Sequence, residues 1–249
     1  MASNRPVVLV TGGGTGVGRA CCLGFAERGY DVVVNFSRSR EEAEQTLVDV
    51  QSRGVDGMLA ACDVSDDSRV RQMIDSIGER FGRLDVLVNN AAMTHFIPLS
   101  DLDEMSEDKW DRILAVNLKG AFFCARASRN WLSDSPQAAI VNVSSVAGLG
   151  GSGSCIAYAA SKGAMSTMTK SLAKALAPKI RVNAVLPGPI DSRWIREGNN
   201  DWDLTEMTAD YPIPRPSQPS DVADCVIFLA TTPQMVTGQL LVVDGGRTM

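Results

Sequence analysis

The chain has 249 residues, 45% of them hydrophobic, which is enough for one α/β domain or two small ones. Its formal net charge of −5 argues against a nucleic-acid partner or an anionic membrane surface. Its single histidine, His95, excludes a site built from several histidines, and we expect no metal. No Cys-x-x-Cys spacing occurs, no signal peptide precedes the first apolar run, and no run approaches the ~18 residues of a membrane span. We therefore expect a cytoplasmic protein with reduced thiols.

Short apolar, β-branched runs alternate with longer helical patterns along the whole chain. The strands are expected at residues 7–10, 31–36, 58–62, 84–89, 139–144, 180–186 and 240–243. The helices are expected at residues 16–28, 40–53, 66–81, 106–132, around 158 to 176, and 220–231. Such alternation, with nearly all-apolar strands, is typical of a parallel sheet covered on both faces. Because no Gly/Ser or Pro run divides the chain, the sequence predicts one α/β domain, residues 1–249, with a doubly wound parallel sheet of about seven strands.

Two segments interrupt this alternation. Residues 145–155 are rich in Gly and Ser and follow a predicted strand, which indicates a loop. Residues 191–218 carry three aromatic side chains together with several acids and prolines. Ligands bind beyond the carboxyl ends of the strands in open α/β sheets, and both segments emerge there. We therefore expect residues 191–218 to form a mobile lid over a substrate pocket.

A glycine-rich turn, Thr11-Gly-Gly-Gly-Thr-Gly-Val-Gly18, joins the first strand to the first helix. Glycines allow a tight turn and let backbone N–H groups approach a pyrophosphate at the helix N-terminus. The sequence thus predicts a Rossmann-type dinucleotide site in which Gly12, Thr15, Gly16 and Val17 contact the cofactor.

Tyr158 and Lys162 are four residues apart on a predicted helix, so their side chains share one face. That face continues through Met165 and Thr169 to Leu172, which indicates that it points inward. A buried lysine beside a phenol favours the phenolate, so we expect Lys162 to lower the pKa of Tyr158 from its usual value near ~10. Such a tyrosine is suited to general acid–base catalysis between an alcohol and a carbonyl. The alternative is an ordinary helix whose lysine extends to solvent.

A second predicted helix carries a buried-looking amide, Asn117. Its expected inward stripe is Trp110, Ile113, Leu114, Asn117, Leu118, Ala121 and Phe122. A buried amide needs hydrogen-bond partners, so Asn117 is either a structural cap or a functional group. Further apolar residues lie off this stripe, at Val116, Phe123, Cys124 and Ala125. We therefore expect the helix to be buried on both sides, by the sheet on one and by a partner subunit on the other.

The glycine turn is the first of a series of motifs in a fixed order. The others are Asp63-Val64, Asn89-Asn90-Ala91-Ala92, Asn117, Ser145 thirteen residues before Tyr158, Pro187-Gly188 and Asp244-Gly-Gly. Together they resemble the short-chain dehydrogenase/reductase family over essentially the whole chain. The nearest type is the single-domain 3-oxoacyl-(acyl-carrier-protein) reductases. Ala92 stands where the family usually has Gly.

The resemblance implies a role for each of four residues. Tyr158 would be the general acid or base, and Lys162 would lower its pKa and bind the nicotinamide ribose. Ser145 would orient the substrate oxygen, and Asn117 would support a proton relay. The implied cofactor contacts, beyond those of the glycine turn, are Asp63, Val64, Asn90, Ala91, Ala92, Tyr158, Lys162, Pro187, Gly188, Ile190 and Ser192. Pairing of the Asn117 and Tyr158 helices between subunits would give a homotetramer.

The choice of nicotinamide cofactor depends on the end of the second predicted strand. An acid there would bind the ribose 2′-OH of NAD, but Val34-Asn35-Phe36 contains none. Ser37 and Arg38 follow, and a guanidinium can hold a 2′-phosphate with charge-assisted hydrogen bonds. NADP(H) is therefore favoured, with NAD(H) possible because Thr15 stands where some relatives carry a further basic residue.

The sequence thus predicts an oxidoreductase that transfers hydride between NADP(H) and a small-molecule carbonyl or secondary alcohol. The expected substrate is a 3-oxoacyl thioester or a small ketone. An NAD-dependent sugar, polyol or steroid dehydrogenase is the alternative, because the lid is acidic at Glu197, Asp201, Asp203, Glu206 and Asp210. A non-catalytic NADP sensor is a more distant alternative, since such proteins usually lose the tyrosine or the lysine. A dehydratase or epimerase is disfavoured by the short segment after Pro187-Gly188.

Overall fold

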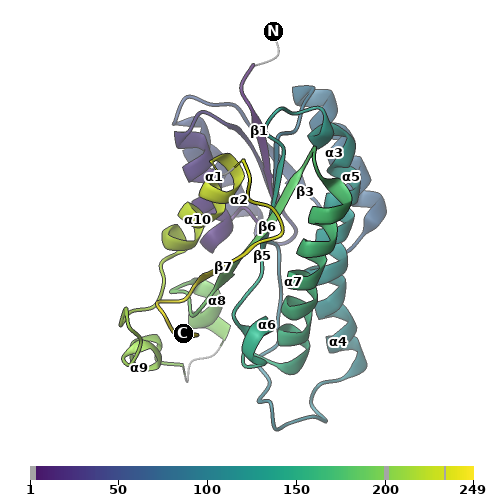
Figure 1. Cartoon of the computed structure of the whole chain (residues 1–249). Coiled ribbons are helices and arrows are strands. Elements are labelled where there is room, and N and C mark those ends of the chain that lie inside the picture. Colours follow the sequence, from purple (N-terminus) through teal and green to yellow (C-terminus); the bar gives the residue numbers. More distant parts are fainter. Residues whose placement is uncertain (1–3, 199–201, 233) are drawn as a thin grey trace.

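The computed structural model describes residues 4–198, 202–232 and 234–249 (Figure 1). Its strands form one parallel sheet in the order β3-β2-β1-β4-β5-β6-β7. The strands are β1 Val7–Val10, β2 Asp31–Phe36, β3 Gly57–Ala61, β4 Val86–Asn89, β5 Ala139–Val143, β6 Arg181–Pro187 and β7 Leu240–Val243. The strand order reverses between β1 and β4, which is where doubly wound sheets bind ligands. The predicted fold class is confirmed.

Helices cover both faces of the sheet (Figure 1). One face carries α1 Gly16–Glu27, α2 Arg40–Gln51 and α10 Pro219–Thr231, and the other carries α3 Asp67–Phe81, α5 Ala121–Ser133 and α7 Ile156–Leu176. Successive side chains of a strand point to opposite faces, so Val8 and Val10 enter one core and Val7 and Leu9 enter the other. This two-sided burial explains why the strands are apolar without alternation.

The predicted helix over residues 106–132 is interrupted. It consists of α4 Glu107–Leu114, a π-helical segment η1 Ala115–Gly120 and then α5. A π turn rotates each residue by less than an α turn does, so the inward face shifts along the helix. Phe122, predicted to point inward, is 39% exposed, whereas Val116, Cys124 and Ala125, predicted to need a partner subunit, are buried in the chain's own core. That part of the prediction is wrong.

The two segments that interrupt the alternation lie at the carboxyl edge of the sheet, at the lower end of Figure 1. The first, predicted as a loop, contains a single short helix, α6 Ala147–Gly150. The predicted lid contains α8 Arg193–Gly198 and α9 Leu204–Thr208. Its acidic residue Asp201, the neighbouring residues 199–200 and the side chain of Glu197 lie outside what the structure describes. Within the described ranges, no helix is long and apolar enough to cross a membrane.

Candidate active site

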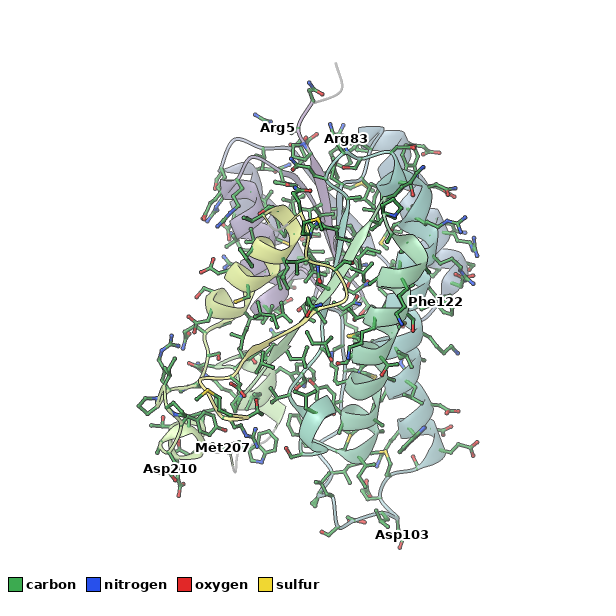
Figure 2. The ribbon with its side chains drawn as sticks, viewed as in Figure 1. Arg5, Arg83, Asp103, Phe122, Met207 and Asp210 are labelled. Carbon is green, nitrogen blue, oxygen red and sulfur yellow. The ribbon has the colours of Figure 1, made fainter. Side chains whose placement is uncertain are left out.

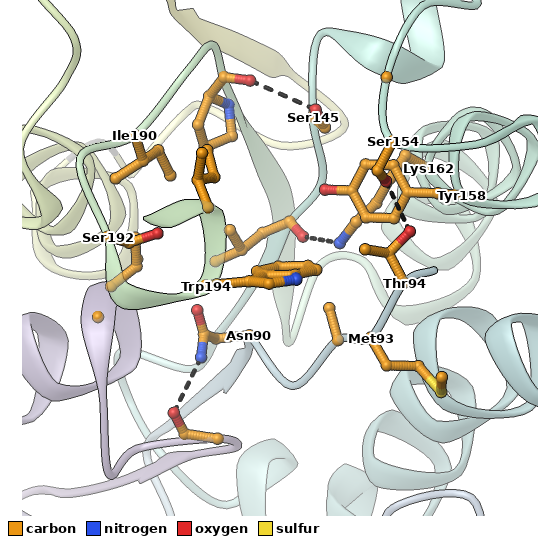
Figure 3. A pocket seen from close by; sticks show the side chains of 18 of the residues that line it. Asn90, Met93, Thr94, Ser145, Ser154, Tyr158, Lys162, Ile190, Ser192 and Trp194 are labelled. Atoms are coloured by element: carbon orange, nitrogen blue, oxygen red, sulfur yellow. Dashed lines mark hydrogen bonds between the residues drawn. The ribbon is translucent and has the colours of Figure 1, made fainter. Parts of the chain in front are cut away.

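One cavity of about 840 Å³ follows the carboxyl edge of the sheet from the glycine turn to the predicted lid. It is lined by all of the predicted cofactor contacts, namely Gly12, Thr15, Gly16, Val17, Ser37, Arg38, Asp63, Val64, Asn90, Ala91, Ala92, Tyr158, Lys162, Pro187, Gly188, Ile190 and Ser192. Ser145 lines it as well, and Asn117 does not. Figure 3 shows the part of the cavity around Tyr158, with Trp194 beside it and with Ile190 and Ser192 on the opposite side. Residues spread from position 12 to position 192 thus meet in one place.

The glycine turn has a shape that only glycine permits at several positions. Gly12 and Gly16 have φ angles of 65° and 52°, in the left-handed region. A Cβ atom on Gly18 would lie 2.1 Å from the carbonyl oxygen of Gly12. The side-chain amide of Asn90 donates to the carbonyl oxygens of Thr11 and Gly12, at 2.9 and 3.1 Å, and ties the turn to the end of β4.

The N-terminus of α1 fits an anion. Thr15, its N-cap residue, makes no side-chain capping bond, so the first N–H groups of the helix are left to the cavity. These donors and the positive end of the helix dipole suit a pyrophosphate. The tight contact between Gly18 of α1 and the Gly12 carbonyl, together with the uncapped N-terminus of α1, fits a dinucleotide site.

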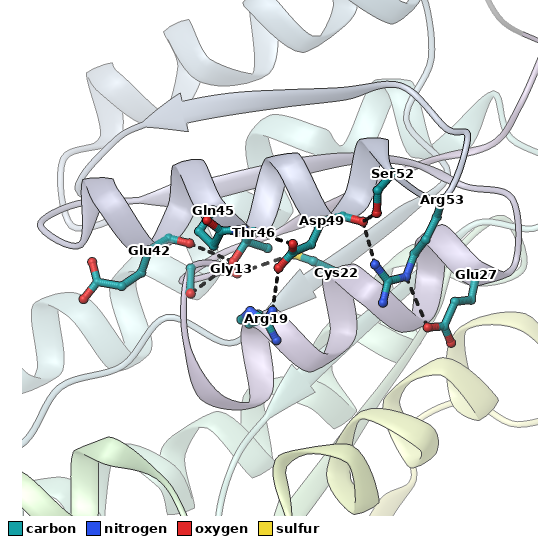
Figure 4. A network of polar contacts seen from close by, with 11 residues as sticks. Gly13, Arg19, Cys22, Glu27, Glu42, Gln45, Thr46, Asp49, Ser52 and Arg53 are labelled. Atoms are coloured by element: carbon teal, nitrogen blue, oxygen red, sulfur yellow. Dashed lines mark hydrogen bonds and ion pairs between the residues drawn. The ribbon is translucent and has the colours of Figure 1, made fainter.

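A polar network holds α2 against this turn (Figure 4). The Thr46 hydroxyl donates to the carbonyl oxygen of Gly14 at 3.1 Å, and Arg19 pairs with Asp49 at 2.6 Å. The thiol of Cys22 lies 3.6 Å from the carbonyl oxygen of Gly13. The turn is therefore positioned by α1, α2 and β4 before any ligand binds.

The adenosine end of the cavity presents one free cation and no free acid among the described residues that line it near β2 and β3. Asn35, at the end of β2, is buried and donates to the carbonyl oxygens of Ala60 and Cys62. Asp63 accepts hydrogen bonds from Arg112 at 2.6 Å and from the Ser65 hydroxyl at 2.7 Å. Although burial opposes it, these bonds lower the pKa of Asp63. Arg38 is exposed and forms no ion pair with any described residue.

Tyr158, Ser145 and Lys162 meet at the middle of the cavity. Lys162 is 2% exposed, its ammonium donates to the carbonyl oxygen of Val143 at 2.7 Å, and it lies 5.6 Å from the centre of the Tyr158 ring. Ser145 lies beside the Tyr158 hydroxyl, and Ser144 instead donates to the carbonyl oxygen of Lys162 at 2.8 Å (Figure 3). This separation of the two serines is what the predicted spacing requires.

The prediction that Lys162 lowers the pKa of Tyr158 is wrong for this structure. Burial raises the pKa of Tyr158 to about 12, although a hydrogen bond with Ser145 opposes the rise. Burial also lowers the pKa of Lys162 to about 7. The Lys162 ammonium is directed at the carbonyl oxygen of Val143 rather than at the phenol oxygen, and desolvation sets the direction of both pKa shifts.

Asn117 lies behind the cavity, in the π-helical segment. Its amide accepts from the N–H of Met93 at 2.8 Å and donates to the carbonyl oxygen of Met93 and to the Ser161 hydroxyl, both at 3.0 Å. Ser161 in turn donates to the carbonyl oxygen of Tyr158 at 2.7 Å. Asn117 therefore joins the loop after β4 to the first turn of α7. Ser161 and Arg112 were not identified from the sequence, because a lone serine or arginine on a helix carries no signal of its own.

The far end of the cavity is aromatic. Trp194 of α8 packs edge to face against Tyr158, with 5.9 Å between ring centres, and Trp202 packs in the same way against Phe96 at 5.5 Å. All four side chains line the cavity. Cys155 is buried beside Ile113 and packs in the core.

Comparisons with known proteins agree with this geometry. A family model described as Enoyl-(Acyl carrier protein) reductase matches residues 12–248. A protein provisionally named ketoacyl reductase 2 of the granaticin polyketide synthase of Streptomyces violaceoruber is 39% identical over 246 residues, which are 98% of this chain and 97% of that one. The 3-oxoacyl-(acyl-carrier-protein) reductase FabG of Staphylococcus aureus is 38% identical over 243 residues, 97% of each chain.

A solved structure is similar over nearly the same length. It is the crystal structure of a Burkholderia xenovorans protein provisionally assigned as a short-chain dehydrogenase/reductase. Its TM-score is 0.92 at 36% sequence identity, and the match covers 98% of each chain. By its family model, its full-length relatives and this fold, the chain belongs to the short-chain dehydrogenase/reductase family and is an NAD(P)-dependent oxidoreductase.

Proposed function

We propose that this protein is an NADP(H)-dependent carbonyl reductase that acts on 3-oxoacyl compounds or similar ketones and, in reverse, on the secondary alcohol. The observation that carries the proposal is that Tyr158, Ser145 and Lys162 line the same cavity as the glycine turn. The names of the relatives, a ketoacyl reductase and a 3-oxoacyl-(acyl-carrier-protein) reductase, support the substrate class.

Tyr158 is proposed as the proton donor. Because burial raises its pKa to about 12, the phenol carries its proton at neutral pH and is ready for the direction of ketone reduction. The Ser145 hydroxyl, beside it, would donate a hydrogen bond to the carbonyl oxygen and orient it. The bound nicotinamide supplies the hydride. Residues of this chain would donate the proton to the carbonyl oxygen and orient the carbonyl group.

Lys162 and Asn117 are proposed to support this pair. With a pKa lowered to about 7, Lys162 can gain or lose a proton near neutrality and can restore the proton of Tyr158. It would also hold the ribose beside the nicotinamide. Asn117 would act through others, since its amide fixes Met93 at the cavity and Ser161 at the start of α7. A proton relay past Asn117 remains part of the proposal.

NADP(H) is proposed over NAD(H) because of Arg38. Its guanidinium lines the cavity without an ion pair among the described residues, whereas Asp63 is already held by Arg112. A ribose 2′-phosphate would therefore meet a free cation and no free carboxylate.

The test of reaction and cofactor is loss of the reduced-nicotinamide absorbance with a 3-oxo ester and with acetoacetyl thioesters. We expect turnover with NADPH, and a KM for NADPH that rises about 10- to 100-fold in Arg38→Leu while the KM for NADH changes little. Arg40→Leu is the matched control, because Arg40 is paired with Glu44 and stacks on Phe36. A wild-type preference for NADH would contradict the assignment of NADP(H).

A homotetramer and a cytoplasmic location are also proposed. Phe122 of α5 is 39% exposed and lies on the outer surface of the chain (Figure 2), with the guanidinium of Arg126 5.3 Å from its ring centre. An exposed aromatic ring on a helix beside α7 is a suitable centre for contact with a second copy. The cysteines of the chain are all free, which fits a reducing compartment.

A further inference from the structure

The end of the cavity beyond Tyr158 carries a group of large apolar side chains. Six large apolar side chains line it, namely Met93, Phe96, Leu99, Trp194, Trp202 and Met207. Trp194 is 41% exposed and Leu99 is 42% exposed, so their faces are not used by the protein's own core. Exposed groups of this size, gathered in one hollow, indicate a ligand surface rather than packing.

The two indoles have a defined geometry relative to the reacting centre. The Trp194 ring lies at an interplanar angle of 85° to the Tyr158 ring, and the Trp202 ring lies at the same angle to the Phe96 ring. Each pair is a T-shaped, edge-to-face contact, and each side of the T forms a corner between two aromatic rings. A flat aromatic group can stack on one ring of a corner while its edge meets the other, which is the arrangement that aromatic groups prefer. One corner includes the proposed proton donor itself.

The charges near this end do not favour an anionic substrate. Asp203 and Glu206 of the lid both line the cavity, and Glu206 has no ion-pair partner among the residues described. Of the cations that line it nearby, Arg193 pairs with Glu42 at 2.5 Å, and the guanidinium of Arg247 lies 5.9 Å from the Tyr211 ring centre without an ion pair among the described residues. The two lid carboxylates outnumber the one cation without an ion pair, so phosphates on a carrier or on coenzyme A would meet a net negative charge here.

We infer that the substrate is an uncharged ketone with an aromatic or polycyclic body, held between the Trp194 and Trp202 corners. The inference rests on the proposed carbonyl reduction and makes its substrate class more specific. The aryl group would stack on the indoles, and the ketone would point back at Tyr158 and Ser145. Straight acyl chains would leave the indole faces partly in water, because a single chain covers less of a flat ring than another ring does.

The test compares matched pairs of substrates under saturating NADPH. Ethyl benzoylacetate and ethyl 3-oxohexanoate differ in an aryl and an alkyl group. Acetoacetyl N-acetylcysteamine and acetoacetyl coenzyme A differ in charge. We expect kcat/KM to be about tenfold higher for the aryl ester than for the alkyl ester, and higher for the neutral thioester than for the coenzyme A thioester.

Variants connect that preference to the two indoles. Trp194→Leu and Trp202→Leu should each lower the aryl-to-alkyl ratio of kcat/KM several-fold. Phe228→Leu, which removes an exposed ring on α10 far from the cavity lining, should leave the ratio unchanged. The ratio is measured within one preparation, so it does not depend on how much of a variant folds.

The outcomes separate the two proposals. Equal or better use of the alkyl ester, a ratio that neither indole variant changes, or a preference for the coenzyme A thioester would overturn the aryl-ketone inference while the reductase assignment stands. No turnover of any ketone, in a protein that binds NADPH by fluorescence, would overturn the proposed function itself.

Discussion

Lys162 is the residue at which this structure departs most from ordinary packing. A lysine side chain is seldom fully buried unless its charge is paired, yet Lys162 is 2% exposed and its partner is a neutral carbonyl group, that of Val143. Burial lowers its pKa to about 7, from 10.5. The folded protein therefore binds fewer protons than the unfolded chain between those two values, and its stability rises with pH across that window.

We predict that Lys162→Met stabilises the fold at neutral pH. One pKa unit corresponds to about 1.4 kcal/mol, and the loss of the Val143 hydrogen bond offsets part of the gain, so we expect about 2 to 4 kcal/mol at pH near ~7. The gain should shrink toward pH ~10, where the buried lysine of the wild type is neutral and the unfolded chain is losing its proton. Urea denaturation at both pH values measures it.

The matched control is Lys174→Met, an exposed lysine on the same helix. We expect its effect to stay within about 0.5 kcal/mol at either pH. A gain for Lys162→Met that is the same at both pH values would show that packing, and not the buried charge, is responsible.

At the scale of elements, the π-helical segment between α4 and α5 is the feature that positions the site. It places the Asn117 amide where it can bond both backbone groups of Met93 and the hydroxyl of Ser161. Single π turns inside α-helices are frequent at functional sites. Here the turn joins the loop after β4 to α7, so the two sides of the cavity are held in fixed positions relative to one another.

We predict that Asn117→Ala lowers the free energy of unfolding by about 2 to 4 kcal/mol, because two partly buried backbone groups of Met93 and the buried Ser161 hydroxyl lose their partner. Ser128→Ala in α5, about three turns further along, is the contrast. The Ser128 hydroxyl is buried with no hydrogen-bond partner among the described residues, so its removal should be neutral or stabilising. Equal losses for both variants in urea denaturation would contradict this account of Asn117.

The elements themselves were largely predictable from the sequence, and the π turn was not. Strand–helix alternation placed every strand within about two residues, since apolar runs of this kind are local signals. The π turn depends on hydrogen bonds between Asn117 and residues about 24 and 44 positions away, which no local pattern contains. Because the inward-facing residues of this segment were predicted with α-helical spacing throughout, Phe122 was placed on the buried face.

At the scale of the whole molecule, the site exists because parallel strands bring their carboxyl ends to one edge. Residues recognised as motifs at strand ends were predicted to meet, and they line one cavity. Arg112 was missed because it lies on α4, whereas its partner, Asp63, follows β3, and no local pattern connects the two. The direction of the pKa shift of Tyr158 was also mispredicted. Desolvation depends on burial by α8 and the sheet, and the spacing of Tyr158 and Lys162 says nothing of that burial.

The proposed homotetramer also belongs to this scale. Its support is now Phe122 and its neighbours on α5, since the chain's own core covers Val116, Cys124 and Ala125. Sedimentation of the native protein should give the mass of four chains, and a mass of one chain would contradict the assembly.

The central claim is that one cavity binds the cofactor along its glycine turn and performs proton transfer at Tyr158. The most direct measurement compares wild type and Tyr158→Phe for NADPH affinity by fluorescence and for kcat with the best ketone. Removal of a single phenolic oxygen should leave the Kd for NADPH within about threefold and lower kcat by about 100- to 10,000-fold, the usual contribution of a general acid. A variant that binds NADPH normally and still turns over at a rate near that of the wild type would contradict the account.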